Sequence, residues 1–288
     1  MKIKKEYLIG LILLAASALY LVLQNDSKIN YKTPQLAEIN KDEVTSIEIQ
    51  GKEKTIELNR NNKMWTIGKE EYRADSGKVS QLITEVAEMS IVDLISLRDD
   101  YARYELDDAH AVSVKVHATD TKRDFLLGKS SSSIYSYIRI PDIPGIFSVK
   151  GDLKSRFSLD SDFWRDKHVL KFNPETVSSL VLEKEGVIKA FRRDSDKSDT
   201  EWTMNDEPLP EDQDIKSRIK QLSTMSCSGF QDKAEGNPLI TVKIQTEEGL
   251  NTLQIFEKQE KGYLATSSYA QTPFLLPENT GDSLLKLM

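Results

Sequence analysis

The sequence predicts an α+β protein in which an N-terminal transmembrane helix precedes two tandem copies of a β-rich module. Each module is expected to pack one main amphipathic helix on antiparallel strands. Three observations support this prediction. An apolar run follows a basic start, the second half of the chain repeats the apolar pattern of the first, and short segments alternate apolar and polar residues.

The first 24 residues have the composition of a membrane anchor. Lys2, Lys4 and Lys5 precede an uncharged apolar run over residues 7–23. A helix of that length extends about 26 Å, slightly less than the ~30 Å hydrocarbon core of a bilayer. The positive-inside rule keeps the lysines cytoplasmic. The sequence therefore predicts a single-pass protein of the inner (cytoplasmic) membrane with most of its chain in the periplasm or extracytoplasmic space.

A cleaved signal peptide is the competing interpretation of this segment. Ala16-Ser17-Ala18 has the small residues of a cleavage site. The apolar run continues to Leu23, which favours an anchor that is retained. Both interpretations send the remaining chain across a membrane.

An internal similarity relates the two halves of the chain. The first matched positions lie 133 residues apart (177 − 44), and each copy then reaches a Trp-Thr pair. The matches are Val44 with Val177, Ile47 with Leu180, and Trp65 with Trp202. Such a repeat indicates one supersecondary unit used twice.

Each copy also contains one stretch with helical spacing. Asp75 or Ser76 can cap the first helix. Its apolar positions recur 136 residues later (215 − 79): Val79, Ile83, Val86 and Met89 match Ile215, Ile219, Leu222 and Met225. The chain is thus divided into an anchor (1–24), a tether (25–38), a first α+β repeat (39–157), a connector (158–170) and a second α+β repeat (171–288), with about ten strands or more.

Composition excludes several functions. The formal charge of −7 argues against a nucleic-acid surface, which needs a basic stripe. Cys227 is the only cysteine, so the chain cannot form an internal disulfide. We expect no nucleic acid, nucleotide or cofactor.

The order of motifs resembles a bacterial envelope family known only as domain of unknown function 4340. The matching segments are Glu43-Val44-Thr45-Ser46-Ile47, Trp65, the helix after Asp75, Leu127-Gly128-Lys129, Tyr137-Ile138-Arg139 and Trp164-Arg165-Asp166-Lys167. The Tyr-Gly-Leu element of the family is Tyr104-Glu105-Leu106 here, a departure that puts a special role for this turn in doubt. The resemblance implies an auxiliary protein of an ABC-type transport system.

Two segments resemble binding loops only in part. Gly128-Lys129-Ser130 ends like a phosphate-binding loop, but Arg123 stands where that loop needs a glycine. Residues 194–198 have the oxygen spacing of a calcium loop, but Asp199 and Asn205 replace its glycine and its bidentate glutamate. We interpret both segments as turns.

Residues with catalytic side chains do not form a recognisable motif. His110 and His117 are an odd number of positions apart, so on one strand they would face opposite ways. We interpret Cys227 as a small core thiol and the two tryptophans as core anchors. The remaining candidates are His168 and the carboxylates Asp99, Asp100, Asp107 and Asp108, which could pair only if the fold brings them together.

The sequence therefore predicts a membrane-anchored extracytoplasmic scaffold without catalytic activity. No catalytic, cofactor-binding or metal-binding residue is assigned. The expected partner is a protein of a membrane complex, with an ABC transporter subunit as the class that the resemblance implies. The alternative is an envelope hydrolase, or a glycan- or lipid-binding module, that uses carboxylates assembled by the fold.

Overall fold

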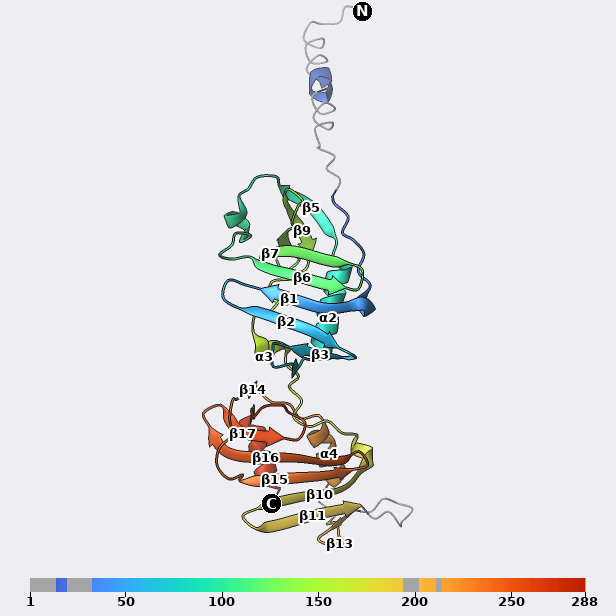
Figure 1. Ribbon diagram of the computed structural model, residues 1–288, viewed down its shortest axis with the longest axis vertical. Coiled ribbons are helices and arrows are strands. Elements are labelled where there is room, and N and C mark those ends of the chain that lie inside the picture. Colours follow the sequence, from blue (N-terminus) through green and yellow to red (C-terminus); the bar gives the residue numbers. More distant parts are fainter. Residues whose placement is uncertain (1–13, 20–32, 194–201, 211–213, 288) are drawn as a thin grey trace, which may run out of the picture.

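The computed structural model describes residues 14–19, 33–193, 202–210 and 214–287. Two nine-stranded sheets are stacked along the long axis of the molecule (Figure 1). All neighbouring strands within each sheet are antiparallel. Each sheet has its own hydrophobic core.

The two sheets have the same strand order. In the first sheet the order is β4 (Tyr72–Arg73), β3 (Met64–Ile67), β2 (Thr55–Asn61), β1 (Val44–Gln50), β6 (Val112–Ala118), β7 (Lys122–Ser132), β8 (Tyr135–Arg139), β9 (Ile146–Lys150), β5 (Ile91–Ser96). In the second it is β13 (Glu207–Pro208), β12 (Trp202–Met204), β11 (Val187–Arg193), β10 (Val177–Lys184), β15 (Ile240–Thr246), β16 (Gly249–Gln259), β17 (Gly262–Ser267), β18 (Phe274–Leu276), β14 (Gly229–Phe230).

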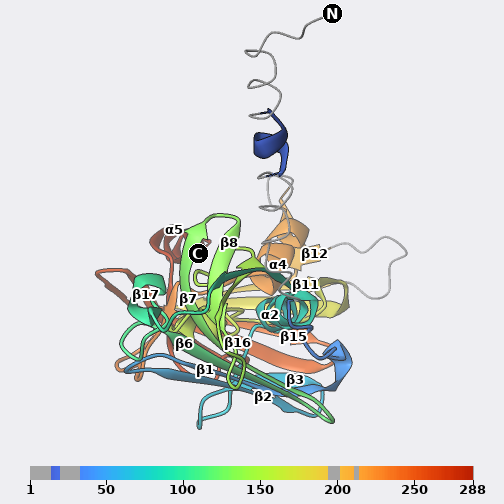
Figure 2. The ribbon, with the colours of Figure 1, turned by 90° about the horizontal axis from the view of Figure 1, so that it is seen from above.

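The helices are few and short. From residue 33 onward the α-helices are α2 (Ser76–Glu88), α3 (Ser161–Trp164), α4 (Ile215–Ser223) and α5 (Glu278–Leu285). Three 3₁₀ turns accompany them: η1 (Lys41–Glu43), η2 (Tyr101–Tyr104) and η3 (Pro174–Thr176). Seen along the long axis, α2 and α4 project onto the same region of the molecule (Figure 2).

The predicted α+β class is therefore wrong, because antiparallel sheet dominates and the helices are minor additions to it. The sequence pattern indicated about ten strands or more, and the described part of the structure has eighteen. Most of the missed strands are edge strands, either only two residues long or, in β5, interrupted by register irregularities. Such segments are too short or too irregular to show the two-residue alternation of a strand.

The predicted membrane anchor is also contradicted. Within the described residues, no helix is long and apolar enough to cross a membrane. Of the predicted span over residues 7–23, the structure describes only residues 14–19, as a short helix. The absence of such a helix among the described residues contradicts the predicted transmembrane helix, the single-pass topology and the inner-membrane location. The other residues of the predicted span lie outside those described.

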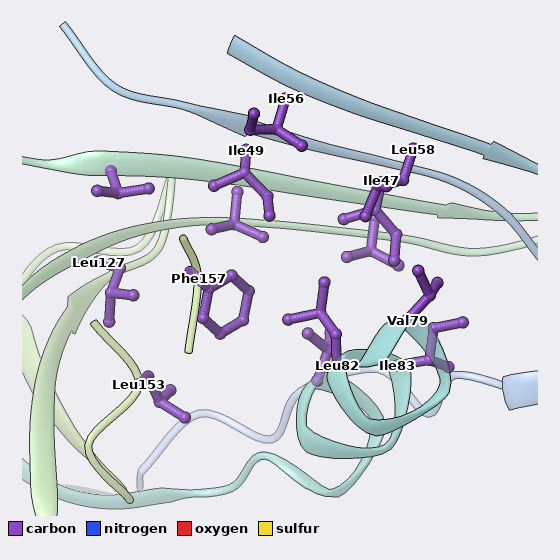
Figure 3. Packing of buried hydrophobic residues seen from close by; sticks show 14 of the residues in the cluster. Ile47, Ile49, Ile56, Leu58, Val79, Leu82, Ile83, Leu127, Leu153 and Phe157 are labelled. Atoms are coloured by element: carbon purple, nitrogen blue, oxygen red, sulfur yellow. The ribbon is translucent and has the colours of Figure 1, made fainter. Parts of the chain in front are cut away.

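The core of the first module forms between α2 and one face of the sheet. Val79, Leu82 and Ile83 point from α2 toward side chains of β1 and β2 (Figure 3). Asp75 starts the helix, since its Oδ1 accepts hydrogen bonds from the N–H groups of Gly77 (2.9 Å) and Lys78 (3.1 Å). Burying each such aliphatic side chain contributes about 1.5–3 kcal/mol.

Candidate functional site

The two sheets meet where β4, the edge of the first sheet, approaches the β14 edge of the second (Figure 1). The connector runs between them. Trp164 belongs to the first core, whereas Val169 and Leu170 belong to the second. The residues at this junction come from β4, the connector, β14 and the loop after β17, and we call them the junction cluster: Tyr72, Arg73, Arg165, Asp166, Phe230, Tyr269, Gln271 and Thr272.

Arg165 is the centre of the junction cluster. Its guanidinium carbon lies 4.1 Å from the ring centroid of Tyr72 in the first module and 3.4 Å from that of Phe230 in the second. Its Nη2 donates a hydrogen bond to Thr272 Oγ1 at 2.6 Å. Burial lowers the pKa of the Arg165 guanidinium. A desolvated cation between two aromatic faces contributes about 2 kcal/mol per favourable pair, so Arg165 holds the two modules together.

Arg73 forms a second contact across the junction. Its Nη1 donates to the carbonyl oxygen of Tyr269 at 2.6 Å, and its guanidinium carbon lies 4.4 Å from the Tyr269 ring centroid. Its backbone N–H donates to Gln271 Oε1 at 2.7 Å. The backbone groups of the edge strand β4 are thus partly satisfied by the other module, which fixes the position of one sheet against the other.

Asp166 contacts both sides of the junction, because its backbone N–H donates to the Arg73 carbonyl oxygen at 2.9 Å and its carboxylate accepts hydrogen bonds from the second module and the connector. The hydroxyl of Tyr269 donates to Oδ2 at 2.8 Å, and the backbone N–H of His168 donates to Oδ1 at 3.0 Å. The ring Nδ1 of His168 also lies 2.7 Å from Oδ1. Burial alone would raise the pKa of Asp166, but these hydrogen bonds outweigh it and hold the pKa below its ordinary value. Burial, reinforced by the Asp166 carboxylate, raises the pKa of Tyr269 to about 12.

The connector also pairs with the second module through its backbone. The Cys227 N–H donates to the Lys167 carbonyl oxygen at 2.9 Å, and the Val169 N–H donates to the Met225 carbonyl oxygen at 3.0 Å. His168 and Ser226 form an antiparallel bridge between these bonds. Three extended connector residues therefore add a short strand to the segment that leads into β14.

The opposite end of the first sheet has a free edge. β5 pairs with β9 on one side and with no strand of the described chain on the other. Three apolar side chains of this segment are exposed: Val92 (47%), Ile95 (38%) and Leu97 (58%). Leu94 and Ile91 instead pack against the core. β5 thus has an apolar solvent-facing side as well as an apolar core-facing side, and we call the three exposed residues the β5 patch.

The corresponding positions of the second module are polar. Leu94 lies opposite Phe147 and Phe230 lies opposite Phe274, so β5 and β14 occupy equivalent places. The residues 136 positions after Val92, Ile95 and Leu97 in the sequence are Ser228, Gln231 and Lys233. Because β5 shifts register between Leu94 and Ser96, only Val92 and Ser228 lie at matching places in the two sheets. The apolar patch is therefore particular to the first module.

The candidate catalytic residues do not converge. His110 pairs locally with Asp107, with Nδ1 2.9 Å from Oδ2 and more than half of the histidine side chain exposed. The hydrogen bond from His110 lowers the pKa of Asp107. Asp99 accepts a hydrogen bond from the hydroxyl of Tyr101 at 2.6 Å. Asp100 and Asp108 are exposed, His117 is exposed on β6, and His168 belongs to the junction.

Metal and phosphate sites do not form from these residues either. Among the described residues, no group of three or more His, Cys, Asp and Glu side chains could hold a metal ion. Gly128-Lys129-Ser130 lies inside β7 and does not begin a helix. Residues 194–199 lie outside the described chain, and Asn205 occupies a tight turn with φ of 53°. Burial raises the pKa of Cys227 to about 11, so its thiol stays protonated.

The sequence alone predicted neither the junction cluster nor the β5 patch. Trp164-Arg165-Asp166-Lys167 was noticed as a connector motif, but nothing in its sequence indicated that Arg165 lies between Tyr72 and Phe230. No strand is predicted over residues 91–96 from the sequence. Its signal was present, because Ile91, Val92, Leu94, Ile95 and Leu97 crowd five apolar residues into seven positions.

These features define a tandem β-sheet protein with a polar junction and one apolar free edge. The chain matches the family described as "Domain of unknown function (DUF4340)" over residues 65–251, and it belongs to that family. Comparison with curated proteins and with solved structures found no match.

Proposed function

We propose that the protein is a non-enzymatic scaffold that binds a protein partner through the β5 patch. The observation that carries this proposal is the exposure of Val92, Ile95 and Leu97 on a free edge strand. Exposed apolar residues scattered singly need no explanation, but exposed apolar side chains on an open edge strand favour association with another chain. A bound partner protein is the simplest way to remove these side chains from water.

The comparison between the modules supports this choice. The second module has polar side chains 136 positions after each of the three residues, so the architecture itself does not require apolar residues along this edge. Burying a valine, an isoleucine and a leucine contributes about 1.5–3 kcal/mol each, which is enough to form the centre of an interface.

The junction cluster supports the scaffold role in another way. Arg165, Arg73 and Asp166 join the modules through buried or partly buried polar contacts, so the patch is presented on a body of fixed shape. A pre-organised surface loses less conformational entropy on binding than a flexible one. The family resemblance implies an ABC transporter subunit as the partner class, and we keep that class as part of the proposal.

The test replaces the β5 patch with the residues of the second module. Val92→Ser, Ile95→Gln and Leu97→Lys are combined in the full chain, and partners are identified by crosslinking in intact cells. We expect the crosslinked partner to decrease at least about tenfold, the equivalent of 1.4 kcal/mol or more. A matched control replaces three other exposed apolar residues, Met64→Gln, Val187→Ser and Leu250→Gln, and should retain the partner.

Equal recovery of the partner from both variants would reject the patch as the binding surface. Loss of cellular function in a folded His110→Gln or Asp107→Asn variant would instead favour the enzyme alternative. Folding of each variant is checked by its unfolding transition, because a destabilised variant loses partners indirectly.

A groove between α4 and α5 supports a second candidate function, the binding of a lipid or another small apolar ligand. Its volume is about 330 Å³, and Leu222, Met225, Leu284 and Arg218 contribute to its walls. The equivalent groove of the first module has about 120 Å³ and contains the ion pair between Arg156 and Glu85. Saturable binding of a fluorescent fatty acid, abolished by Leu284→Arg, would establish this alternative.

A further inference from the structure

We propose that the partner binds by strand addition: an extended apolar segment of another protein pairs with the backbone of β5 and becomes the tenth strand of the first sheet. This inference rests on the proposed function and specifies the chemistry of recognition. The site consists of the free backbone edge of Ile91–Ser96 together with the β5 patch.

The chain itself contains the precedent. In the second module, connector residues 167–169 pair in antiparallel fashion with residues 225–227 through two backbone hydrogen bonds. Those residues lead directly into β14, the equivalent of β5. The same edge of this architecture is therefore able to accept an extended segment.

Among the described residues, no segment of the first module covers this edge in the same way. At the separation of 133 that relates the two copies (167 − 34), residues 34–36 correspond to the connector residues 167–169. In the described part of the chain, no backbone hydrogen bond or bridge joins residues 33–38 to residues 89–91. The carbonyl oxygen of Ala37 instead accepts a hydrogen bond from the buried Arg123. The edge of β5 is thus left open.

The side chains of β5 specify an apolar partner strand. In an added strand, the residues on one face lie beside the outward residues of β5, and such cross-strand pairs contribute about 0.2–1 kcal/mol each. Val92 and Ile95 on that face are β-branched, which suits pairing with valine or isoleucine. The matching segment therefore alternates apolar and polar residues and contains no proline.

Asp93 protects the open edge in the free protein. The N–H of Leu94 donates to Asp93 Oδ1 at 2.9 Å and is thereby satisfied without a neighbouring strand. An exposed charge on an edge strand also opposes unwanted pairing. An incoming strand has to displace this carboxylate, so removal of the carboxylate should strengthen binding.

A second copy of this chain stacked head to tail is a poor occupant. Head-to-tail stacking would bring β13 of one copy to β5 of the next, as β4 meets β14 inside the chain. Thr66 pairs with Arg73 in the first sheet, and Thr203 pairs with Pro208 in the second, so Pro208 takes the place of Arg73. Proline has no backbone N–H and cannot continue a ladder, so head-to-tail stacking of copies is disfavoured. Pairing of β5 with β5 of a second copy across a two-fold axis is the competing occupant that the experiment tests.

The experiment uses a fluorescein-labelled peptide, Lys-Val-Thr-Val-Thr-Val-Thr, and the full-length protein. Two isomers of the peptide are N-methylated, one on its valines and one on its threonines, so that each blocks one hydrogen-bonding edge. If the peptide adds as a strand, methylation should weaken the binding of one isomer at least about tenfold and that of the other much less. The reason is that two or three hydrogen bonds of ~0.5–1.5 kcal/mol are lost on only one edge of the peptide. Hydrogen exchange should slow at alternate amides of residues 91–96.

The variant Asp93→Ala should bind the peptide more tightly, whereas Glu207→Ala on the opposite edge strand is the matched control and should not change binding. Absence of saturable binding, equal weakening by both methylated isomers, or protection outside β5 would each overturn strand addition. Concentration-dependent dimerisation that the peptide displaces would identify a second copy as the occupant and also overturn it. If strand addition fails while the β5 patch variant still loses its cellular partner, the proposed function stands with side-chain contacts alone.

Discussion

Arg165 lies over the ring of Phe230, with its guanidinium carbon 3.4 Å from the ring centroid, although the two residues are 65 positions apart (230 − 165). Tyr72 of the first module flanks the same guanidinium at 4.1 Å. A delocalised planar cation between two aromatic rings therefore contributes to the relative placement of the modules, beside the contacts of Arg73 and Asp166.

Replacement of Arg165 by lysine should uncouple the modules. A lysine ammonium is a compact, strongly hydrated charge and cannot stack between two rings as guanidinium does. We expect the junction to lose about 2 kcal/mol, so that the two sheets unfold at separate temperatures. Calorimetry measures the transitions, and Lys258→Arg on the exposed surface is the control. A single unchanged transition for Arg165→Lys would contradict a coupling role.

The junction should also depend on pH at both extremes. The folded-state pKa of Asp166 is lowered, so its stabilisation is present above the ordinary value near 3.9 and is lost as the pH falls through the folded pKa. The pKa of Tyr269 is raised to about 12, so its stabilisation is present below its ordinary value near 10 and is lost as the pH rises through about 12.

Denaturant unfolding across this pH range measures the effect. Asp166→Asn should remove part of the acid dependence, and Tyr269→Phe should remove part of the alkaline dependence. In an alkaline titration followed by tyrosinate absorbance, the Tyr269→Phe variant should have one tyrosine fewer than the unmodified protein among those that ionise at the highest pH. Unchanged pH profiles in both variants would show that the hydrogen bond of 2.8 Å between these residues does not stabilise the junction.

The sequence predicted local packing well because local packing is what repeats. Asn40 and Asn173 each accept a hydrogen bond from the backbone two residues later, at 3.2 Å and 3.1 Å, and each starts a turn before the first strand of its sheet. Trp65 and Trp202 are both buried, on β3 and β12. Both features follow from residue type and spacing within one copy.

The site could not be predicted in the same way. The sandwich around Arg165 combines Tyr72, Arg165 and Phe230, which only the stacking of two sheets brings together. β5 lacked a clean two-residue alternation because its pairing with β9 shifts register between Ile91 and Asp93 and again between Leu94 and Ser96. The anchor prediction used the basic flank and the length of the apolar run, and the described residues include no helix that could span a membrane.

Gly128 should not tolerate a side chain. A Cβ at this position would overlap with the carbonyl oxygen of Tyr104 and with the side chain of Leu106, which is itself fully buried. We expect Gly128→Ala to lower the free energy of unfolding by about 1–3 kcal/mol, the usual cost of overpacking. Gly229→Ala is the matched control, because a Cβ there meets nothing within 4 Å. Denaturant titration compares the two, and equal stabilities would contradict the close approach.

Glu105 ends the turn of η2, and its backbone is left-handed, with φ of 55° and ψ of 37°. This conformation costs a non-glycine residue about 1–2 kcal/mol. Glu105 offsets part of this cost by accepting a hydrogen bond from Lys154 Nζ at 2.5 Å, which also lowers the pKa of Glu105. Both side chains are more than a third exposed, so the pair contributes only about 0–1 kcal/mol.

Glycine at position 105 should therefore be tolerated better than alanine. Glu105→Ala loses the ion pair and keeps the backbone strain, whereas Glu105→Gly loses the ion pair and relieves the strain. We expect the glycine variant to exceed the alanine variant by about 1 kcal/mol in free energy of unfolding. Lys154→Ala, which removes the ion pair from the other side, measures that contribution separately. An alanine variant as stable as the glycine variant would show that the turn does not need a left-handed residue.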